Sequence, residues 1–342
     1  MNSPSIPKTN NFDFLRHFLA FSVVWHHFIV LTGISYSFFV FDLINSNIAV
    51  KAFFVISGLL IWISANNTNT ITAYTLKRFF RLYPALIFIL FTSSVVTLVV
   101  YEQPFTEILQ YFSWNSIFLN FMHPCIGNVF DSNELCAVNG ALWTLKLEVS
   151  YYFFIGITVF FMKTYAYKLV VIFTIISVLI ETCLLFIPYL NESYALLLSN
   201  QIPFKFYYFG LGVIINNYHK SISTLNFLLA FFLGLVGWFG FNIEFFFLPL
   251  FVVSFVFLIA FRTPIINMSR FGDLSYGLYI FHFPLIQLFV YNDWLSGRFY
   301  IDFFIIISIL LILSRISWLH IESKSISYGK QLITKTKRFS YS

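Results

Sequence analysis

Long hydrophobic runs separated by short polar segments make up most of this chain. Ten of the runs have about the length that a helix needs to cross a bilayer, roughly 20 residues, although the sixth is shorter. The runs occupy residues 12–33, 48–65, 82–101, 143–161, 169–188, 203–216, 222–240, 244–261, 273–291 and 299–319. The pattern predicts an all-α, polytopic integral membrane protein, a bundle of about ten transmembrane helices.

Composition excludes an ordinary soluble protein. Hydrophobic residues form 59% of the chain and charged residues 10%, whereas a soluble domain carries about 25% charge. The N-terminal segment lacks a basic n-region and a small-residue cleavage site, so we expect the first helix to be retained and not removed as a signal peptide. Without a long polar block, the chain is expected to form one integral domain over residues 1–342, with no fused soluble domain.

The distribution of basic residues predicts the orientation in the membrane. Basic residues gather on one set of loops, and such loops face the cytoplasm. An even number of helices then places both termini in the cytoplasm and the loop 102–142 outside. This also explains the net charge of +6 without any nucleic-acid partner. The basic residues on the predicted cytoplasmic side are Lys8, Lys77, Arg78, Arg81, Lys163, Lys168, Lys220, Arg262, Arg270, Lys324, Lys330, Lys335, Lys337 and Arg338.

Two of the three cysteines, Cys125 and Cys136, share the loop 102–142. They suit a disulfide if the loop is extracytoplasmic, but the sequence does not decide whether the bridge forms. A zinc site with His123 is the alternative, although the paired CxxC spacing is missing. Cys183 lies in an apolar run, and we expect it in the core.

The first apolar run carries ionisable residues, which are costly in a membrane and usually mark function. Arg16 and His27 are eleven positions apart, which returns them to within about 20° of one helix face, separated by about 16 Å along the axis. They form a polar stripe along the helix. The alternative is structural: Arg16 snorkels to lipid headgroups, and His27 satisfies a backbone carbonyl of another helix.

Three further residues, Arg78, Arg81 and Glu148, carry charge at predicted helical positions. Arg78 and Arg81 are three apart at the predicted start of the third helix and suit a phosphate clamp, although cytoplasmic anchoring explains them as well. Glu148 lies about one turn inside the fourth helix and could orient an imidazole or anchor the helix at its rim. Ser57 and Gly58 in the second helix suit close helix packing.

The ninth helix carries Ser275, Tyr279 and His282 at i, i+4 and i+7, on one face. Pro284 has no amide hydrogen, which leaves the carbonyl of Ile280 without its helical donor in the middle of the membrane. His282 could therefore satisfy backbone groups or take part in chemistry.

Five blocks of this sequence together resemble the membrane acyltransferase-3 family, which includes bacterial O-antigen and capsule O-acetyltransferases. The blocks match the family's Arg-x10-His, FFVxSGFLI, RxxRxYP, WSLSxExxFY and SYxxYxxHxP patterns in order. They lie at residues 13–27, 53–60, 78–84, 143–152 and 275–284. Two departures stand out: His26 adjoins His27, where the x10 spacing selects His27, and Lys146 replaces the second Ser of WSLS.

The resemblance implies an O-acetyltransferase of the bacterial inner membrane, with acetyl-CoA as donor co-substrate and a glycan or lipid-linked saccharide, such as lipopolysaccharide or capsule, as acceptor. It implies that His27, Arg16 and Glu148 are catalytic, that Arg78 and Arg81 bind the donor, and that Tyr279, His282 and Ser275 bind substrate. No metal and no tightly bound cofactor are expected. Direct transfer and an acyl-histidine intermediate both remain open. The rival hypothesis is a glycan or glycolipid transporter that uses buried Arg and His for substrate or protons.

Overall fold

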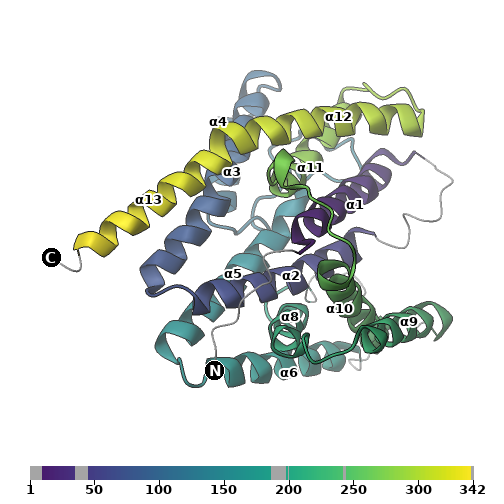
Figure 1. Cartoon of the computed structure of the whole chain (residues 1–342). Coiled ribbons are helices and arrows are strands. Elements are labelled where there is room, and N and C mark those ends of the chain that lie inside the picture. The colour runs from purple at the N-terminus through teal and green to yellow at the C-terminus, as the bar shows by residue number, and fades with distance from the viewer. Residues whose placement is uncertain (1–9, 35–44, 186–197, 199, 242–243, 340–342) are drawn as a thin grey trace. The chain divides into compact units, whose positions relative to one another are not determined.

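A computed structural model of the protein describes residues 10–34, 45–185, 198, 200–241 and 244–339 (Figure 1). Lys8, which the charge argument includes, lies outside this part. The described residues form helices and no strand. The elements are α1 (Phe12–Thr32), α2 (Ser46–Asn66), α3 (Ile71–Val99), α4 (Phe105–Ser116), η2 (Gly140–Leu142), α5 (Trp143–Phe161), α6 (Ala166–Leu185), α8 (Phe206–Tyr218), α9 (Thr224–Phe241), α10 (Glu244–Arg262), η3 (Ser269–Phe271), α11 (Ser275–Tyr291), α12 (Phe299–Ser317), η4 (Trp318–Glu322) and α13 (Ser323–Phe339).

Each of the ten predicted apolar runs forms a helix, and the protein is a polytopic helical membrane protein. Eight helices of the described chain are long and apolar enough to cross a bilayer. The other two are shorter: α8 has 13 residues and α11 has 17. At 1.5 Å per residue these two span about 20 and 25 Å, less than the roughly 30 Å of bilayer hydrocarbon. The described chain therefore has eight full-length spans and two shorter apolar helices, against a predicted count of about ten.

Hydropathy misplaced one helix start and missed two helices, α4 and α13. The third helix begins at Ile71 and not near residue 82, so Arg78 and Arg81 lie inside α3 and not at its start. Thr70 caps this earlier start, because its Oγ1 accepts the amide hydrogen of Ala73 at 3.2 Å. The polar residues of the first turns hide the helix from a search for apolar runs. The same reason explains α4, which lies in the segment expected to be a loop.

The chain divides into two compact units, each assembled from separate stretches, and we describe each by itself. The first unit comprises Met1–Arg16, Val50–Tyr74 and Leu147–Met268. In it, glycines bring α2 and α8 into backbone contact: a Cβ on Gly58 would overlap the carbonyl of Phe209, and one on Gly212 would overlap the carbonyl of Val55. The predicted packing role of Gly58 is confirmed.

Ion pairs and lipid-facing side chains complete the first unit. Lys51 Nζ lies 2.8 Å from Glu244 Oε1, and Lys205 Nζ lies 2.8 Å from Glu181 Oε1. These pairings offset charges that would otherwise be costly between apolar helices. Cys183 is exposed on α6, so its predicted core position is wrong. It continues an exposed apolar stripe along α6 with Ile172, Ile175, Ile176 and Leu179, because that helix turns a whole face away from its neighbours.

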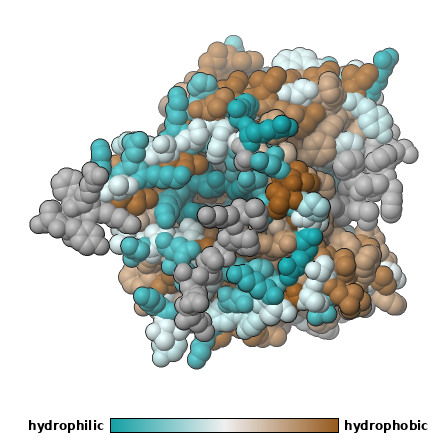
Figure 2. All heavy atoms as spheres, viewed as in Figure 1, coloured by the Kyte–Doolittle hydropathy of each residue, from teal (hydrophilic) through white to brown (hydrophobic). Residues whose placement is uncertain are grey.

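The second unit comprises His17–Ala49, Thr75–Lys146 and Ser269–Ser342. Its longest feature is the continuous run of α12, the π-helical turn η4 and α13 (Figure 1). Residues Phe299–Lys335 of this run extend about 56 Å, well beyond the bilayer hydrocarbon. Figure 2 shows the change along it, from hydrophobic side chains over α12 to mostly hydrophilic ones over α13. Phe80 of α3 packs edge-on against Tyr328 of α13, with ring centroids 5.6 Å apart.

Candidate functional site

The polar stripe of α1 and the polar face of α11 meet at two histidines, His27 and His282, called here the histidine pair. His27 Nδ1 lies 2.8 Å from His282 Nε2, and the two rings stack with centroids 5.0 Å apart and planes 12° from parallel. His282 is fully buried, whereas His27 keeps partial exposure. A second contact ties His282 to its own helix, since its Nδ1 lies 3.1 Å from the carbonyl oxygen of Leu278.

The N-cap residue of η2 supplies the hydrogen bond that the proline of α11 removes. Pro284 leaves the carbonyl of Ile280 without a helical donor. Asn139 supplies one: its Nδ2 donates to that carbonyl at 2.9 Å, while its Oδ1 accepts the amide hydrogen of Ala141 at 3.3 Å. The orphan acceptor expected from the sequence is therefore satisfied by Asn139 and not by His282.

Tyr279 holds α11 against the start of α5. Its hydroxyl donates to the carbonyl of Ala141 at 2.9 Å and also contacts the hydroxyl of Thr144. Between these contacts, Gly140 lets the ring of Phe283 approach, because a Cβ on that glycine would lie 2.6 Å from Phe283 Cζ. These neighbours place the backbone that carries His282, one turn away along α11.

The segment before η2 is pinned to the other end of α11. Gln287 Nε2 donates to the carbonyls of Leu135 at 2.6 Å and Ala137 at 2.8 Å, and its Oε1 accepts from Asn133 at 2.9 Å. A disulfide joins Cys125 to Cys136, with Cα atoms 5.4 Å apart. The bonded sulfurs leave the zinc alternative without its thiolates.

No group of three or more His, Cys, Asp or Glu side chains elsewhere in the described chain could hold a metal ion.

A polar cluster, defined as Arg81, Asp273 and Ser275, lies at the N-terminal end of α11. Arg81 Nη2 lies 2.5 Å from Asp273 Oδ2, and Ser275 Oγ donates to Asp273 Oδ1 at 2.5 Å. The side chain of Asp273 is 11% exposed, so the ion pair is largely shielded from solvent. His17 lies next to this cluster, since its Nε2 accepts the amide hydrogen of Leu274 at 3.1 Å. Arg81, which was predicted to bind the acyl donor, is thus paired with a carboxylate.

A buried carboxylate in the π-helical turn borders this cluster. Glu322 is 3% exposed, and its Oε1 accepts the hydroxyl hydrogen of Ser317 at 2.9 Å. It lies within electrostatic range of Arg81 and Asp273. π-helical turns are uncommon and often occur at functional sites.

Two predicted catalytic residues have partners in the first unit. Arg16 Nη2 pairs with Asp13 Oδ1 at 2.5 Å, one turn back along α1. Glu148 Oε1 accepts the hydroxyl hydrogen of Ser57 at 2.9 Å and that of Tyr152. Their predicted roles in catalysis stay predictions.

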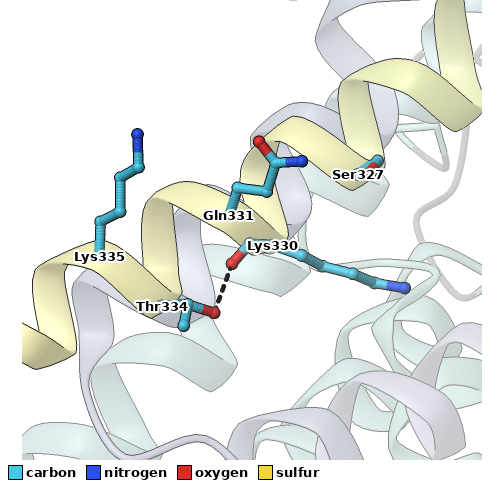
Figure 3. A pocket seen from close by; sticks show the side chains of 5 residues that line it. All are labelled: Ser327, Lys330, Gln331, Thr334 and Lys335. Carbon is cyan, nitrogen blue, oxygen red and sulfur yellow. Dashed lines mark hydrogen bonds between the residues drawn. The ribbon is translucent and has the colours of Figure 1, made fainter.

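A hydrophilic groove runs along α13. Its volume is about 390 Å³, and Ser327, Lys330, Gln331, Thr334 and Lys335 line it (Figure 3). All five side chains can donate hydrogen bonds, and two carry a positive charge. Lys330 and Lys335 are among the basic residues that the charge argument predicts on the cytoplasmic side.

A family model matches most of this chain. The model of a family described as an acyltransferase domain, acyltransferase-3, matches residues 9–319 of this chain. The chain belongs to this family. It is therefore a membrane acyltransferase, and the resemblance inferred from the five sequence blocks is confirmed.

Two curated relatives cover nearly the whole chain. An O-acetyl transferase of Shigella phage Sf6 is 28% identical over 337 residues, which is 93% of this chain and 96% of that protein. Nodulation protein 10 of Rhizobium leguminosarum bv. viciae is 26% identical over 325 residues, 86% of this chain and 88% of that protein. No solved structure matches this chain.

Sequence reasoning found both members of the histidine pair but did not place them together. It missed Asn139, Thr144, Asp273 and His17. One signal was available for Asn139: a proline inside an apolar helix leaves a carbonyl that requires a donor from another segment. The partners of Arg81 and His17 leave no comparable trace in the sequence.

Proposed function

We propose that this protein is an O-acetyltransferase of the bacterial inner membrane, which transfers an acetyl group from acetyl-CoA to a hydroxyl of an extracytoplasmic envelope glycan such as lipopolysaccharide or capsule. Its family supports acyl transfer, and the name of the phage relative supports an acetyl group and an oxygen acceptor.

The observation that carries the proposal is the histidine pair. A half-buried imidazole inside a helical membrane protein, hydrogen-bonded to a second imidazole, is suited to accept and return a proton. His27 takes the proton of the sugar hydroxyl as the hydroxyl oxygen attacks the thioester carbonyl. The carbon–sulfur bond then breaks, and the departing thiolate of coenzyme A receives the proton. In the acyl-enzyme variant, the ring of His27 itself attacks the thioester before the sugar does.

The remaining predicted residues keep the roles that the family resemblance implies. Arg78 and Arg81 hold the donor phosphates, and Arg81 does so by exchanging Asp273 for phosphate. Arg16 stabilises negative charge on the donor. Tyr279 and Ser275 of α11 bind the substrate. Glu148, near the start of α5, is the third predicted catalytic residue.

Charge and redox chemistry support the proposed direction of transfer. The basic loops favour the cytoplasm, where acyl-CoA is present. The disulfide of Cys125 and Cys136 suits an oxidising compartment, and so supports an outer location for the loop 102–142. Both arguments support a donor that binds from the cytoplasm and an acceptor that binds outside.

The test uses envelope glycan from cells that make equal membrane amounts of wild type, His27→Ala or His26→Ala. Mass spectrometry measures a base-labile acetyl mass on the saccharide. We expect it with wild type and His26→Ala, and its loss with His27→Ala. His26 is the matched control, since it has the same side chain one position away and is not a member of the pair. If wild type changes only the surface export of the glycan and adds no acetyl mass, the proposal fails and a transporter takes its place.

A further inference from the structure

We propose that His282 is a positioning residue that holds His27 in one tautomer, with the bare Nε2 of His27 as the reacting nitrogen. The inference rests on the proposed function and extends it: it names the reacting atom and the residue that selects it. It follows from four atoms in a row, which are the carbonyl oxygen of Leu278, Nδ1 and Nε2 of His282, and Nδ1 of His27.

The direction of each hydrogen bond follows from the carbonyl. A carbonyl oxygen can only accept, so His282 Nδ1, at 3.1 Å from the oxygen of Leu278, must carry a hydrogen. In a neutral imidazole the other nitrogen is then an acceptor, so His282 Nε2 has a lone pair. His27 Nδ1, at 2.8 Å from that lone pair, must be the donor. Nε2 of His27 is consequently left without a hydrogen.

Burial supports the neutral form of both rings. His282 is fully buried, and its ring lies between Tyr279 and Phe283, with centroids 6.0 Å and 6.2 Å away. An additional proton would place a charge among these apolar groups, which costs several kcal/mol unless an anion compensates it. The chain of two neutral hydrogen bonds needs no such charge in the resting enzyme.

The scaffold around α11 explains how His282 keeps this orientation. Asn139 satisfies the carbonyl of Ile280, and Tyr279 is bonded to the carbonyl of Ala141. Phe283 packs edge-on against His27, with centroids 5.5 Å apart. The rings therefore have defined neighbours on several sides, which a reacting group requires for accurate positioning.

The arrangement has a chemical consequence. When Nε2 of His27 takes the hydroxyl proton, the ring becomes an imidazolium, and its Nδ1–H bond to His282 becomes charge-assisted and stronger. His282 thus stabilises the protonated intermediate without carrying a resting charge into the membrane interior. The acyl-enzyme variant uses the same nitrogen, because only a bare nitrogen can attack the thioester.

A matched pair of variants tests the role of the acceptor at His282. In His282→Gln the carboxamide reaches the place of Nε2 and can accept from His27. In His282→Asn it reaches only the place of Nδ1, so the bond to Leu278 is kept and the acceptor is lost. With purified protein in nanodiscs and acetyl-CoA as donor, we expect kcat to fall about 100-fold in His282→Asn and less than about 10-fold in His282→Gln. The KM for acetyl-CoA should not change in either variant.

Solid-state ¹⁵N NMR on histidine-labelled wild type in bilayers reads the tautomer without turnover, and a His27→Gln sample assigns the signals. We expect a protonated Nδ1 and a bare Nε2 for His27, with a coupling between His27 Nδ1 and His282 Nε2 across the hydrogen bond. A protonated Nε2 on His27 would overturn the inference, as would equal kcat losses in the two variants or no loss in either.

These outcomes separate the inference from the proposed function. If wild type transfers no acetyl group, the function fails whatever the tautomer is. If wild type is active and depends on His27, but His282→Asn keeps the wild-type kcat, the function stands and the inference is wrong.

Discussion

The bond between Asn139 and the carbonyl of Ile280 gives a prediction that can be measured without knowing the substrate. Both residues are buried, at 4% and 0% exposure, so no water can replace the lost donor in Asn139→Ala. An unsatisfied buried carbonyl costs about 1–3 kcal/mol. Asn139 also caps η2 through its bond to Ala141, and loss of such a cap costs about 1 kcal/mol. We therefore expect Asn139→Ala to lower the free energy of unfolding by about 2–4 kcal/mol.

Pro284 is the reason that the carbonyl of Ile280 needs Asn139, so a substitution of this proline supplies the control. In Pro284→Ala the new amide hydrogen can bond to Ile280 within α11, and Asn139 is no longer needed there. In that background Asn139→Ala should lose only the cap, about 1 kcal/mol. The coupling between the two sites is then about 1–3 kcal/mol in a double-mutant cycle.

The assay is reversible unfolding in mixed micelles, followed by circular dichroism and tryptophan fluorescence for the four proteins of the cycle. Acetyl transfer is measured in parallel. Coupling near zero would refute the reasoning, because it would mean that Asn139 does not compensate for the missing amide hydrogen of Pro284.

Three further outcomes are expected. Cys136→Ser, or reduction of the wild type, should lower the free energy of unfolding by roughly 3 kcal/mol, because the bridge to Cys125 closes a short loop; no effect of reductant on wild type would contradict this. Arg81→Ala should lower thermal stability, because it leaves the largely buried carboxylate of Asp273 without its cation. Exchange of the two residues (Arg81→Asp with Asp273→Arg) should restore part of the lost stability. Equal stability of wild type and Arg81→Ala would refute the role of the pair. Burial lowers the pKa of His219, beyond the end of α8, and the nearby Lys220 and Arg262 lower it further. The unfolded chain therefore binds the proton more readily, and stability should fall as the pH drops below about 6.5 toward the lower folded pKa. His219→Gln should flatten this acid limb of the unfolding midpoint against pH, and an unchanged limb would exclude His219 as a contributor.

Local sequence determined the helices and the candidate chemistry. Apolar runs located the ten predicted helices because burial in lipid needs a continuous hydrophobic stretch, a property of neighbours in the chain. Gly58 was assigned to packing because only glycine allows such a close helix approach. Arg16 and His27 were placed on one face by helical period alone. Helix ends were less accurate, as at α3, because capping residues such as Thr70 decide them rather than hydropathy.

Only the tertiary structure decided which polar groups meet. The sequence offered Glu148 as the partner of an imidazole, but the nitrogen Nδ1 of His27 is occupied by His282, 255 positions away in the chain. Arg81 was expected to be available for phosphate, but it is paired with Asp273, 192 positions away. The physical reason is the same in both cases. Inside a membrane, each polar group must find a donor or acceptor from another helix, and the helix that supplies it depends on packing rather than on local pattern.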